Sequence, residues 1–361
     1  PGDGKFDTNN PPTLPEMRLG RIDLRNMPAF GLTEVQLLQQ YLNRSHQWRH
    51  KQFTVRDLAI VQTNSAETVA PYEVYGQYSQ LFGNGTNYVS AHWLSTATNT
   101  ANSFLLASSH GNGNYTDDFL IGSTIEYAAA PGLYSAFNSI YGSYFGDWDS
   151  GVHTNDVMLA PLASPGYALG LYYREAQVDM NPSTMGDRYS DDIWFQCVND
   201  FVGSDAKYIQ NGYWYINGST FLNSLRVPQY IQFHGDPTLR IRQVAPPTNL
   251  VVTPSGSDNV LTWTDAIDNY VQGHHVYRAP ASNLNDFTRL TSSPTTSPYT
   301  DAGEAGGSYS YMVRAVKLEQ SDSRSYYLAS QGIFAETQGE VGFQLRVKIS
   351  GEILFNGIKI N

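Results

Sequence analysis

A histidine and a serine at the ends of two apolar runs are the residues of this sequence best suited to catalysis. His110 directly follows the run Phe104–Ser109, and Ser143 comes two residues after the run Tyr134–Tyr141. An imidazole can take the proton of a hydroxyl, so the two residues are a candidate general base and nucleophile. They can act together only if the fold brings the ends of the two runs side by side.

The rest of the first 245 residues alternates between short apolar runs and segments with helical spacing, which predicts an α/β fold. Strands are expected at Leu58–Val61, Phe104–Gly111, Tyr134–Tyr141, Gly166–Tyr173, Gln229–Phe233 and Leu239–Arg242, and helices at Leu32–Leu42, Tyr72–Phe82, Asp192–Val202 and Phe221–Leu225. Thr33 can cap the first helix. Such alternation favours a mostly parallel sheet covered by helices on both faces. Functional groups collect beyond the carboxyl ends of parallel strands, so His110 is expected near Ser143.

This arrangement resembles the gingipain-type cysteine peptidase family, which has a caspase-like fold. In that family one strand ends in His-Gly, and the next ends in the nucleophilic Cys, three residues before a Gly-Asp step. The corresponding steps are His110-Gly111 and Gly146-Asp147, and counting back three residues from Gly146 gives Ser143. The resemblance therefore places the nucleophile at Ser143, where this chain has no cysteine. The single cysteine, Cys197, is far away in the sequence.

Two further segments extend the resemblance. Arg18–Asp23 resembles the family's Gly-Arg-Ile step, and Phe233–Arg242 resembles its closing Gly-Asp-Pro-Ser-Leu strand, which is the most specific match. The resemblance implies a gingipain-like caspase-fold domain over residues 18–244. Residues 1–17 would then be a linker or the remnant of a preceding subdomain.

The exchange of cysteine for serine leaves two interpretations of the site. A thiol ionises near neutral pH, whereas a serine hydroxyl needs a base that a carboxylate holds in place. Asp117, Asp118 and Asp147 are nearby in sequence, but spacing alone selects none of them. In an active secreted endopeptidase, the resemblance would assign substrate contacts to Gly111, Gly142, Tyr144 and Asp147.

In the other interpretation the site is a degenerate, non-catalytic one. His110 would be a loop histidine bonded to the backbone, and Ser143 a small residue that closes a tight strand-to-helix turn. The aromatic side chains near Ser143 would fill the substrate cleft; they are Tyr141, Tyr144, Phe145 and Trp148. The chain would then be a binding or structural protein.

Composition narrows the class of partner. The 361 residues carry a net charge of −11, which disfavours nucleic acid and anionic membranes, and only 15% of them are charged. Such a surface, with 25 tyrosines, favours an extracellular or cell-surface protein whose partner is a protein or peptide. No apolar run reaches the roughly 20 residues of a membrane span. One cysteine excludes an internal disulfide.

Metal and cofactor signals are weak. Asp3 and Asp7 could supply oxygen ligands to calcium, but no bidentate Glu follows at the required distance, so a solvated linker is the alternative. The spacing of His234, His274 and His275 matches no zinc pattern. No phosphate-binding glycine loop follows a strand, so we expect no nucleotide cofactor.

From Pro246 the pattern changes to short alternating strands separated by turn residues. The strand candidates are Leu250–Val252, Val260–Trp263, His275–Arg278 and Tyr309–Val316. A Trp on an early strand and a Tyr-X-Tyr-X-Val-X-Ala run on a late one resemble a fibronectin type III domain, over residues 245–336. In secreted proteins the resemblance implies a spacer or adhesive module.

The tail, residues 337–361, alternates apolar and polar positions from Val341 to Ile349 and then places Asn356-Gly357 between two apolar runs. Asn-Gly is the strongest short signal for a two-residue hairpin. Either a further β domain begins at this point, or the tail adds strands to a sheet of another molecule. The second alternative implies self-association, as in the subunit of a surface assembly or fibre.

Overall fold

In the computed structural model the chain divides into two compact units. One comprises residues 1–245 and 317–331, and the other residues 246–316 and 332–361. The structure describes residues 21–63, 86–88, 93–110, 114–118, 121–141, 154–174, 231–236, 239–240, 242–320, 325–337, 354–355 and 358–359.

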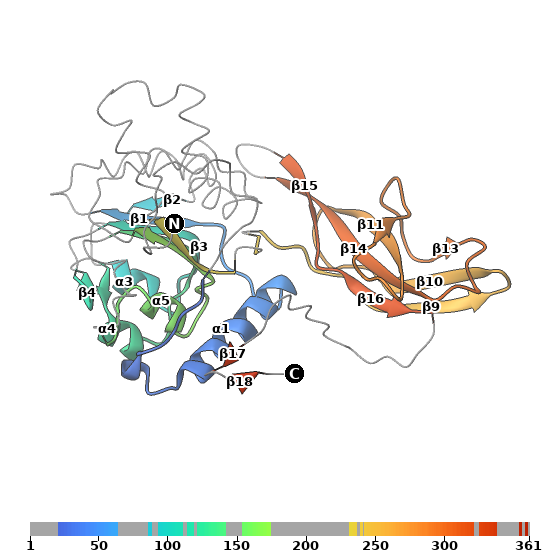
Figure 1. The fold of residues 1–361 in the computed structure, drawn as a ribbon. Coiled ribbons are helices and arrows are strands. Elements are labelled where there is room, and N and C mark those ends of the chain that lie inside the picture. The colour runs from blue at the N-terminus through green and yellow to red at the C-terminus, as the bar shows by residue number, and fades with distance from the viewer. Residues whose placement is uncertain are drawn as a thin grey trace, which may run out of the picture. The chain divides into compact units, whose positions relative to one another are not determined.

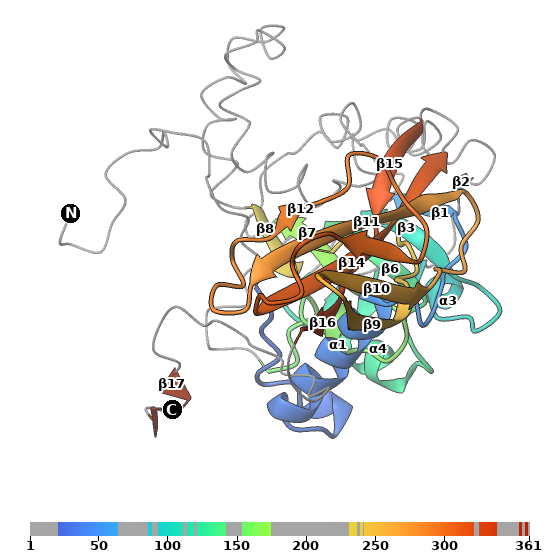
Figure 2. The same cartoon turned by 90° about the vertical axis from the view of Figure 1, so that its right-hand side faces the viewer.

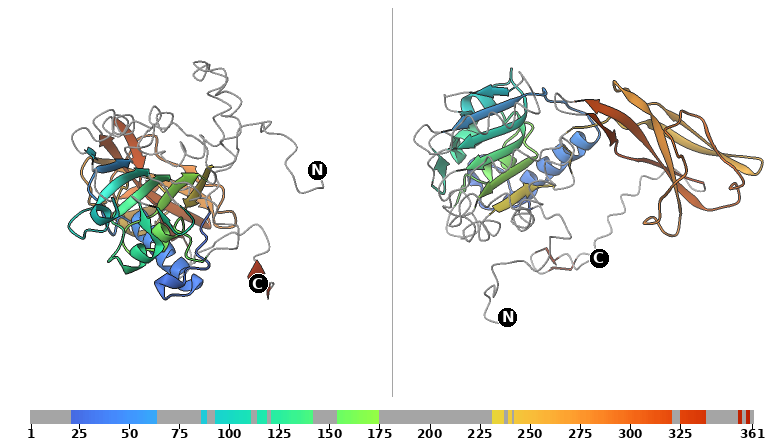
Figure 3. Two further views of the ribbon diagram at one scale, coloured as in Figure 1. Left: turned by 90° about the vertical axis from the view of Figure 1, so that its left-hand side faces the viewer. Right: turned by 90° about the horizontal axis from the view of Figure 1, so that it is seen from above.

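The first unit is built on a six-stranded sheet with the order β2-β1-β3-β6-β7-β8 (Figures 1 and 3). Neighbouring strands are parallel except β7 and β8, which are antiparallel. The strands are β1 (Ala59–Thr63), β2 (Thr86–Tyr88), β3 (Phe104–His110), β6 (Ser135–Tyr141), β7 (Gly170–Arg174) and β8 (Ile231–Gly235). The predicted mostly parallel sheet is therefore confirmed.

The register defines two edges of this sheet. At the carboxyl edge, where β1, β3 and β6 end, the last row is Thr63, His110 and Tyr141, and the row before it is Gln62, Ser109 and Ile140. At the opposite, amino edge, β3, β6 and β7 begin. Because β8 runs antiparallel, its last residue, Gly235, pairs with Gly170 at the amino edge.

The described helices of this unit are the long α1 (Glu34–Arg49) and four short ones, η1 (Pro28–Phe30), α3 (Trp93–Ala97), α4 (Thr124–Ala129) and α5 (Ala160–Ala163). Thr33 caps α1 as predicted, because its Oγ1 accepts from the Gln36 N–H at 3.3 Å and Gln36 Oε1 accepts from the Thr33 N–H at 2.9 Å. The buried face of α1 joins α3, α4, α5 and one face of the sheet in a single apolar core. Among the described helices, none is long and apolar enough to cross a membrane.

The Gly-Asp step after β8 is held by α1. Gly235 has φ +127°, and a Cβ there would lie 2.5 Å from the Leu169 carbonyl oxygen, so only glycine fits. The buried Tyr41 hydroxyl donates to that same oxygen at 2.8 Å and accepts from the Asp236 N–H at 2.7 Å. Arg49 forms an ion pair with Asp236. Gly235 and Asp236, together with Tyr41 and Arg49, thus form a structural clamp.

A buried arginine extends this clamp to α5. The Arg44 guanidinium donates to the carbonyls of Leu162 at 2.8 Å and Ser164 at 2.9 Å, which satisfies the C-terminal end of the short helix. Burial lowers the pKa of Arg44 to about 10, so the side chain remains charged at neutral pH.

The strand expected at Leu239–Arg242 does not form at the described positions 239, 240 and 242. Instead of a neighbouring strand, side chains from elsewhere in the chain bond to this segment. Trp48 Nε1 donates to the Arg240 carbonyl at 2.8 Å, and Arg242 pairs with Asp57 at 2.8 Å. The described residues of this segment therefore add no strand to the sheet.

Two antiparallel sheets form a sandwich (Figures 1 and 2), which consists of strands of the second unit together with β15 and the last residues of β14, from the segment 317–331. One has the order β13-β10-β9, and the other has the order β12-β11-β14-β15 with β16 also paired to β14. The strands are β9 (Thr248–Ser255), β10 (Asp258–Thr264), β11 (Val271–Pro280), β12 (Thr288–Arg289), β13 (Tyr299–Asp301), β14 (Tyr309–Gln320), β15 (Ser325–Ala329) and β16 (Ile333–Glu336). Leu261, Trp263, Val276, Tyr311 and Val313 form the core between the sheets. All four strands expected in this region are present.

The tail contains the expected hairpin. β17 (Leu354–Phe355) pairs antiparallel with β18 (Ile358–Lys359), with Phe355 opposite Ile358, so that two residues of the sequence separate the strands. The alternating segment before it, and the expected helices at 72–82, 192–202 and 221–225, lie outside the described residues.

Candidate functional site

The candidate histidine, at the end of β3, lies next to the end of β6, the strand after which the candidate serine follows in the sequence. β3 forms because Leu105, Leu106 and Ala107 are an apolar run buried on both faces of the sheet. Its last residue, His110, pairs with Tyr141, the last residue of β6. Ser143 follows Tyr141 by two residues in the sequence and lies outside the described residues.

Of the remaining residues proposed for the site, the structure describes only two. Gly111, Gly142, Tyr144 and Asp147, and also Cys197 and the calcium candidates Asp3 and Asp7, lie outside the described residues. Asp117 and Asp118 form the short strand β4, which pairs with β5 (Gly122–Ser123). The exposed Asp117 carboxylate accepts a hydrogen bond from Asn114 Nδ2 at 2.9 Å, so it bonds to a residue of its own loop.

Two polar side chains at the carboxyl edge were not singled out from the sequence. Gln62 on β1 and Ser109 on β3 are directly paired, and each is only 1% exposed. Neither Gln62 Oε1, Gln62 Nε2 nor Ser109 Oγ has a hydrogen-bond partner in the described part of the chain. The sequence feature that could have identified them is a polar residue just before the last residue of each of two mainly apolar strands.

Another buried polar residue on the same sheet is fully bonded. Asn138 on β6 is completely buried. Its Nδ2 donates to the carbonyls of Ser135 and Gly170, each at 3.3 Å, and its Oδ1 accepts from the Ser135 hydroxyl. The sheet can therefore satisfy a buried amide side chain, and Gln62 differs from Asn138 in its surroundings.

His234, His274 and His275 lie in different surroundings and form no common group. His234 on β8 is completely buried, and burial followed by the charge of Arg21 lowers its pKa to about 3. In the sandwich, His274 lies 3.4 Å from the Asp265 carboxylate and His275 Nδ1 lies 2.9 Å from Thr291 Oγ1. Among the described residues, no three His, Cys, Asp or Glu side chains form a metal-binding group.

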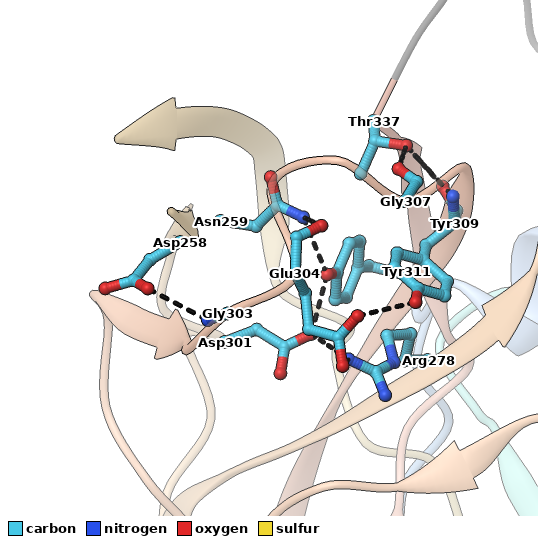
Figure 4. Close-up of polar contacts among 10 residues, drawn as sticks. All are labelled: Asp258, Asn259, Arg278, Asp301, Gly303, Glu304, Gly307, Tyr309, Tyr311 and Thr337. Atoms are coloured by element: carbon cyan, nitrogen blue, oxygen red, sulfur yellow. Dashed lines mark hydrogen bonds and ion pairs between the residues drawn. The ribbon is translucent and has the colours of Figure 1, made fainter. Parts of the chain in front are cut away.

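The sandwich contains a polar cluster around Arg278 (Figure 4). Arg278 contacts the carboxylates of Asp301 and Glu304, each at 2.8 Å, and lies over the Tyr309 ring. Tyr309 donates to Glu304, and Tyr311 donates to Asp301 at 2.7 Å. The Tyr309 hydroxyl, and then Arg278, hold the pKa of Glu304 below its usual value despite partial desolvation. Because cation and carboxylates are matched to each other, the cluster stabilises the turn between β13 and β14.

No family model matches the chain, and no curated protein matches it. A solved protease is 11% identical with a TM-score of 0.48, and the alignment covers 83% of this chain and 73% of the protease. An Fn3-like protein from Clostridium thermocellum is 30% identical over 26% of this chain and 92% of its own, with a TM-score of 0.20. Pectate lyase PelI from Erwinia chrysanthemi is 23% identical over 26% of this chain and 27% of its own, also with a TM-score of 0.20. All three TM-scores are below 0.5, so these similarities assign neither a family nor a function to the chain.

Proposed function

We propose that this chain is an extracellular, peptide-binding relative of the gingipain-type peptidases with a caspase-like sheet domain, and that it does not cleave what it binds. One observation carries the proposal: the pairing of His110 with Tyr141, which aligns the ends of the two strands that lead to the candidate base and nucleophile. The carboxyl edge of a parallel sheet is the usual place for a ligand.

The loss of catalysis follows from the chemistry of Ser143. A thiol beside an imidazole is ionised to a useful extent at neutral pH, and a serine hydroxyl is not. An active serine site would need a carboxylate that orients the histidine. Asp117, the described carboxylate among the sequence candidates, is bonded to Asn114. The proposal is therefore a site that recognises a peptide but lacks the reactive group.

The proposal is tested with a pooled peptide library. The full chain should enrich a subset of peptides and release them uncut, as judged by mass spectrometry. Cleavage that disappears in Ser143→Ala and in His110→Ala would overturn the non-catalytic assignment and establish a serine endopeptidase. Failure to enrich any peptide would overturn the binding assignment.

A gain-of-function variant tests whether the two strand ends form one site. In a Cys197→Ser background, Ser143→Cys introduces the family's nucleophile. If His110 lies beside it, the new thiol should react with iodoacetamide at pH 6, well below the pKa of about 8.5 of a free thiol. The same protein with His110→Ala should lose this reactivity, and equal reactivity in both would place His110 outside the site.

We also propose that the sandwich is a fibronectin type III spacer, which supports the extracellular location. One of its sheets has three strands and the other contains the remaining strands, and Trp263 is buried on β10. Labelling of intact producing cells with a membrane-impermeant amine reagent would test the location. An unlabelled chain in intact cells that becomes labelled after lysis would contradict it.

One observation favours a second function, strand donation by the tail. β17 and β18 form a two-stranded sheet of their own, separate from both sheets of the sandwich. An isolated hairpin is marginally stable in water, so further strands would stabilise it. Light scattering should show association of the full chain and a monomer after deletion of residues 340–361. A full chain that is already a discrete monomer would exclude this function.

A further inference from the structure

Three buried polar atoms without partners among the described residues lie on two paired residues at the carboxyl edge. Gln62 and Ser109 occupy adjacent positions on β1 and β3, one residue before the row that contains His110. Both side chains are 1% exposed, and three of their polar atoms have no partner in the described part of the chain. Ile140, the next residue in the row, is also buried and brings no polar group.

Buried polar atoms without partners are unfavourable, because they lose their bonds to water and gain none in the protein. A bond between Gln62 and Ser109 would not remove the problem, since the Gln62 amide would keep a donor unpaired. Asn138 shows that this sheet can provide hydrogen-bond partners for a buried amide side chain. The unpaired atoms at the carboxyl edge therefore point to a ligand.

We infer that Gln62 and Ser109 form a receptor for an uncharged amide group of a bound peptide. This inference rests on the proposed peptide-binding function and names the chemistry of recognition. The geometry points to the strand ends beside His110 as the place where that amide lies.

The chemistry of the pair selects the ligand class. Gln62 offers both a donor, Nε2, and an acceptor, Oε1, and the Ser109 hydroxyl can act as either. A peptide amide carries the complementary N–H and C=O groups. The pair itself brings no charge into a buried row, so a carboxylate or ammonium would lose its hydration without a counter-ion there. A neutral amide is therefore favoured over a charged terminus or side chain.

The experiment combines stability with binding in the full chain. In the double variant Gln62→Met/Ser109→Ala, apolar groups of similar size replace the unpaired ones. The variant should unfold at a temperature about 2–4 °C higher than the wild type, because no protein bond is lost. Asn138→Leu should change the unfolding temperature in the opposite direction. Gln47→Met makes the same exchange as Gln62→Met on the exposed side of α1 and should change neither property.

Binding is measured with N-acetylglycine N-methylamide, a neutral molecule made of two amides, and with the enriched library peptides. The wild type should bind both, and the double variant should bind at least about tenfold more weakly, since two or more hydrogen bonds are lost. Binding of the small amide without peptide enrichment would retain the receptor and reject the proposed function. Peptide enrichment with equal affinity in both proteins would retain the function and reject the receptor. A double variant that is less stable than the wild type would also reject it, because the side chains would then serve the fold.

Discussion

The two edges of the parallel sheet differ in how far their buried polar groups are hydrogen-bonded. At the amino edge, Tyr41 bonds both the Leu169 carbonyl and the Asp236 N–H, and Arg44 caps α5 through Nη1 and Nη2, although its Nε has no partner among the described residues. At the carboxyl edge, Gln62 and Ser109 are as deeply buried but have no partner among the described residues. One edge is arranged for stability, whereas the other retains polar groups that an apolar core would exclude. Such stability loss is typical of binding sites.

The comparison predicts its largest effect at the glycine of the amino edge. Gly235→Ala should lower the free energy of unfolding by about 4 kcal/mol, because the new Cβ would meet the Leu169 carbonyl oxygen at 2.5 Å and the φ of +127° is strained for alanine. Urea unfolding of the full chain measures the change. Gly31→Ala is the control: its φ is also positive, +63°, but no atom lies within 4 Å of the added Cβ, so the loss should be about 1 kcal/mol. Equal losses would show that the clamp has no tight packing.

The next largest effect is expected for the hydroxyl of Tyr41. Tyr41→Phe leaves the buried Leu169 carbonyl and the Asp236 N–H without this partner, so the free energy of unfolding should fall by about 2–3 kcal/mol. Tyr134→Phe is the matched control, because its hydroxyl is exposed and makes only a 3.5 Å contact with the Pro131 carbonyl. A loss that does not differ between the two variants would contradict the special role of the amino edge.

His234 makes the amino edge sensitive to acid. Its folded-state pKa, about 3, is below the ordinary value of 6.5, because burial and then Arg21 disfavour the charged ring. Between these values the unfolded chain binds a proton that the folded chain does not, so the free energy of unfolding falls as pH falls from about 6.5 toward 3. From pH 6 to pH 4 the wild type should lose about 2 kcal/mol more than His234→Gln. Above pH 8 the difference between the two proteins should become constant, and parallel curves throughout would refute the assignment.

Local patterns in the sequence were enough to predict much of the sheet. The apolar runs at 104–109 and 134–141 predicted β3 and β6, Thr33 predicted the start of α1, and Asn356-Gly357 predicted the tail hairpin. In each case the deciding interaction is between residues close in the chain or follows a simple periodicity.

Features set by distant residues were not predictable in this way. The sequence of residues 239–242 is typical of a strand, but Trp48, almost two hundred residues earlier, donates a hydrogen bond to the Arg240 carbonyl. Gln62 and Ser109 look like ordinary polar residues near strand ends, and only the parallel pairing of β1 with β3 shows that they are buried together. The candidate histidine was predictable because a motif marked it, whereas the unpaired amide and hydroxyl carry no motif.

The smallest predicted effect is also the most direct test of the two edges, because the same substitution is made at each. Ser135, at the start of β6, is completely buried and donates its hydroxyl to Asn138 Oδ1, and Ser109, near the end of β3, is equally buried and bonds nothing described. Ser135→Ala should lower the free energy of unfolding by about 1 kcal/mol, because a buried acceptor loses its donor. Ser109→Ala should raise it by about 0.5–1 kcal/mol, because an unpaired polar atom is removed from the core. Both values come from urea unfolding of the full chain. Two losses of similar size would mean that the Ser109 hydroxyl is bonded in the folded protein, and the carboxyl edge would then be as well satisfied as the amino edge.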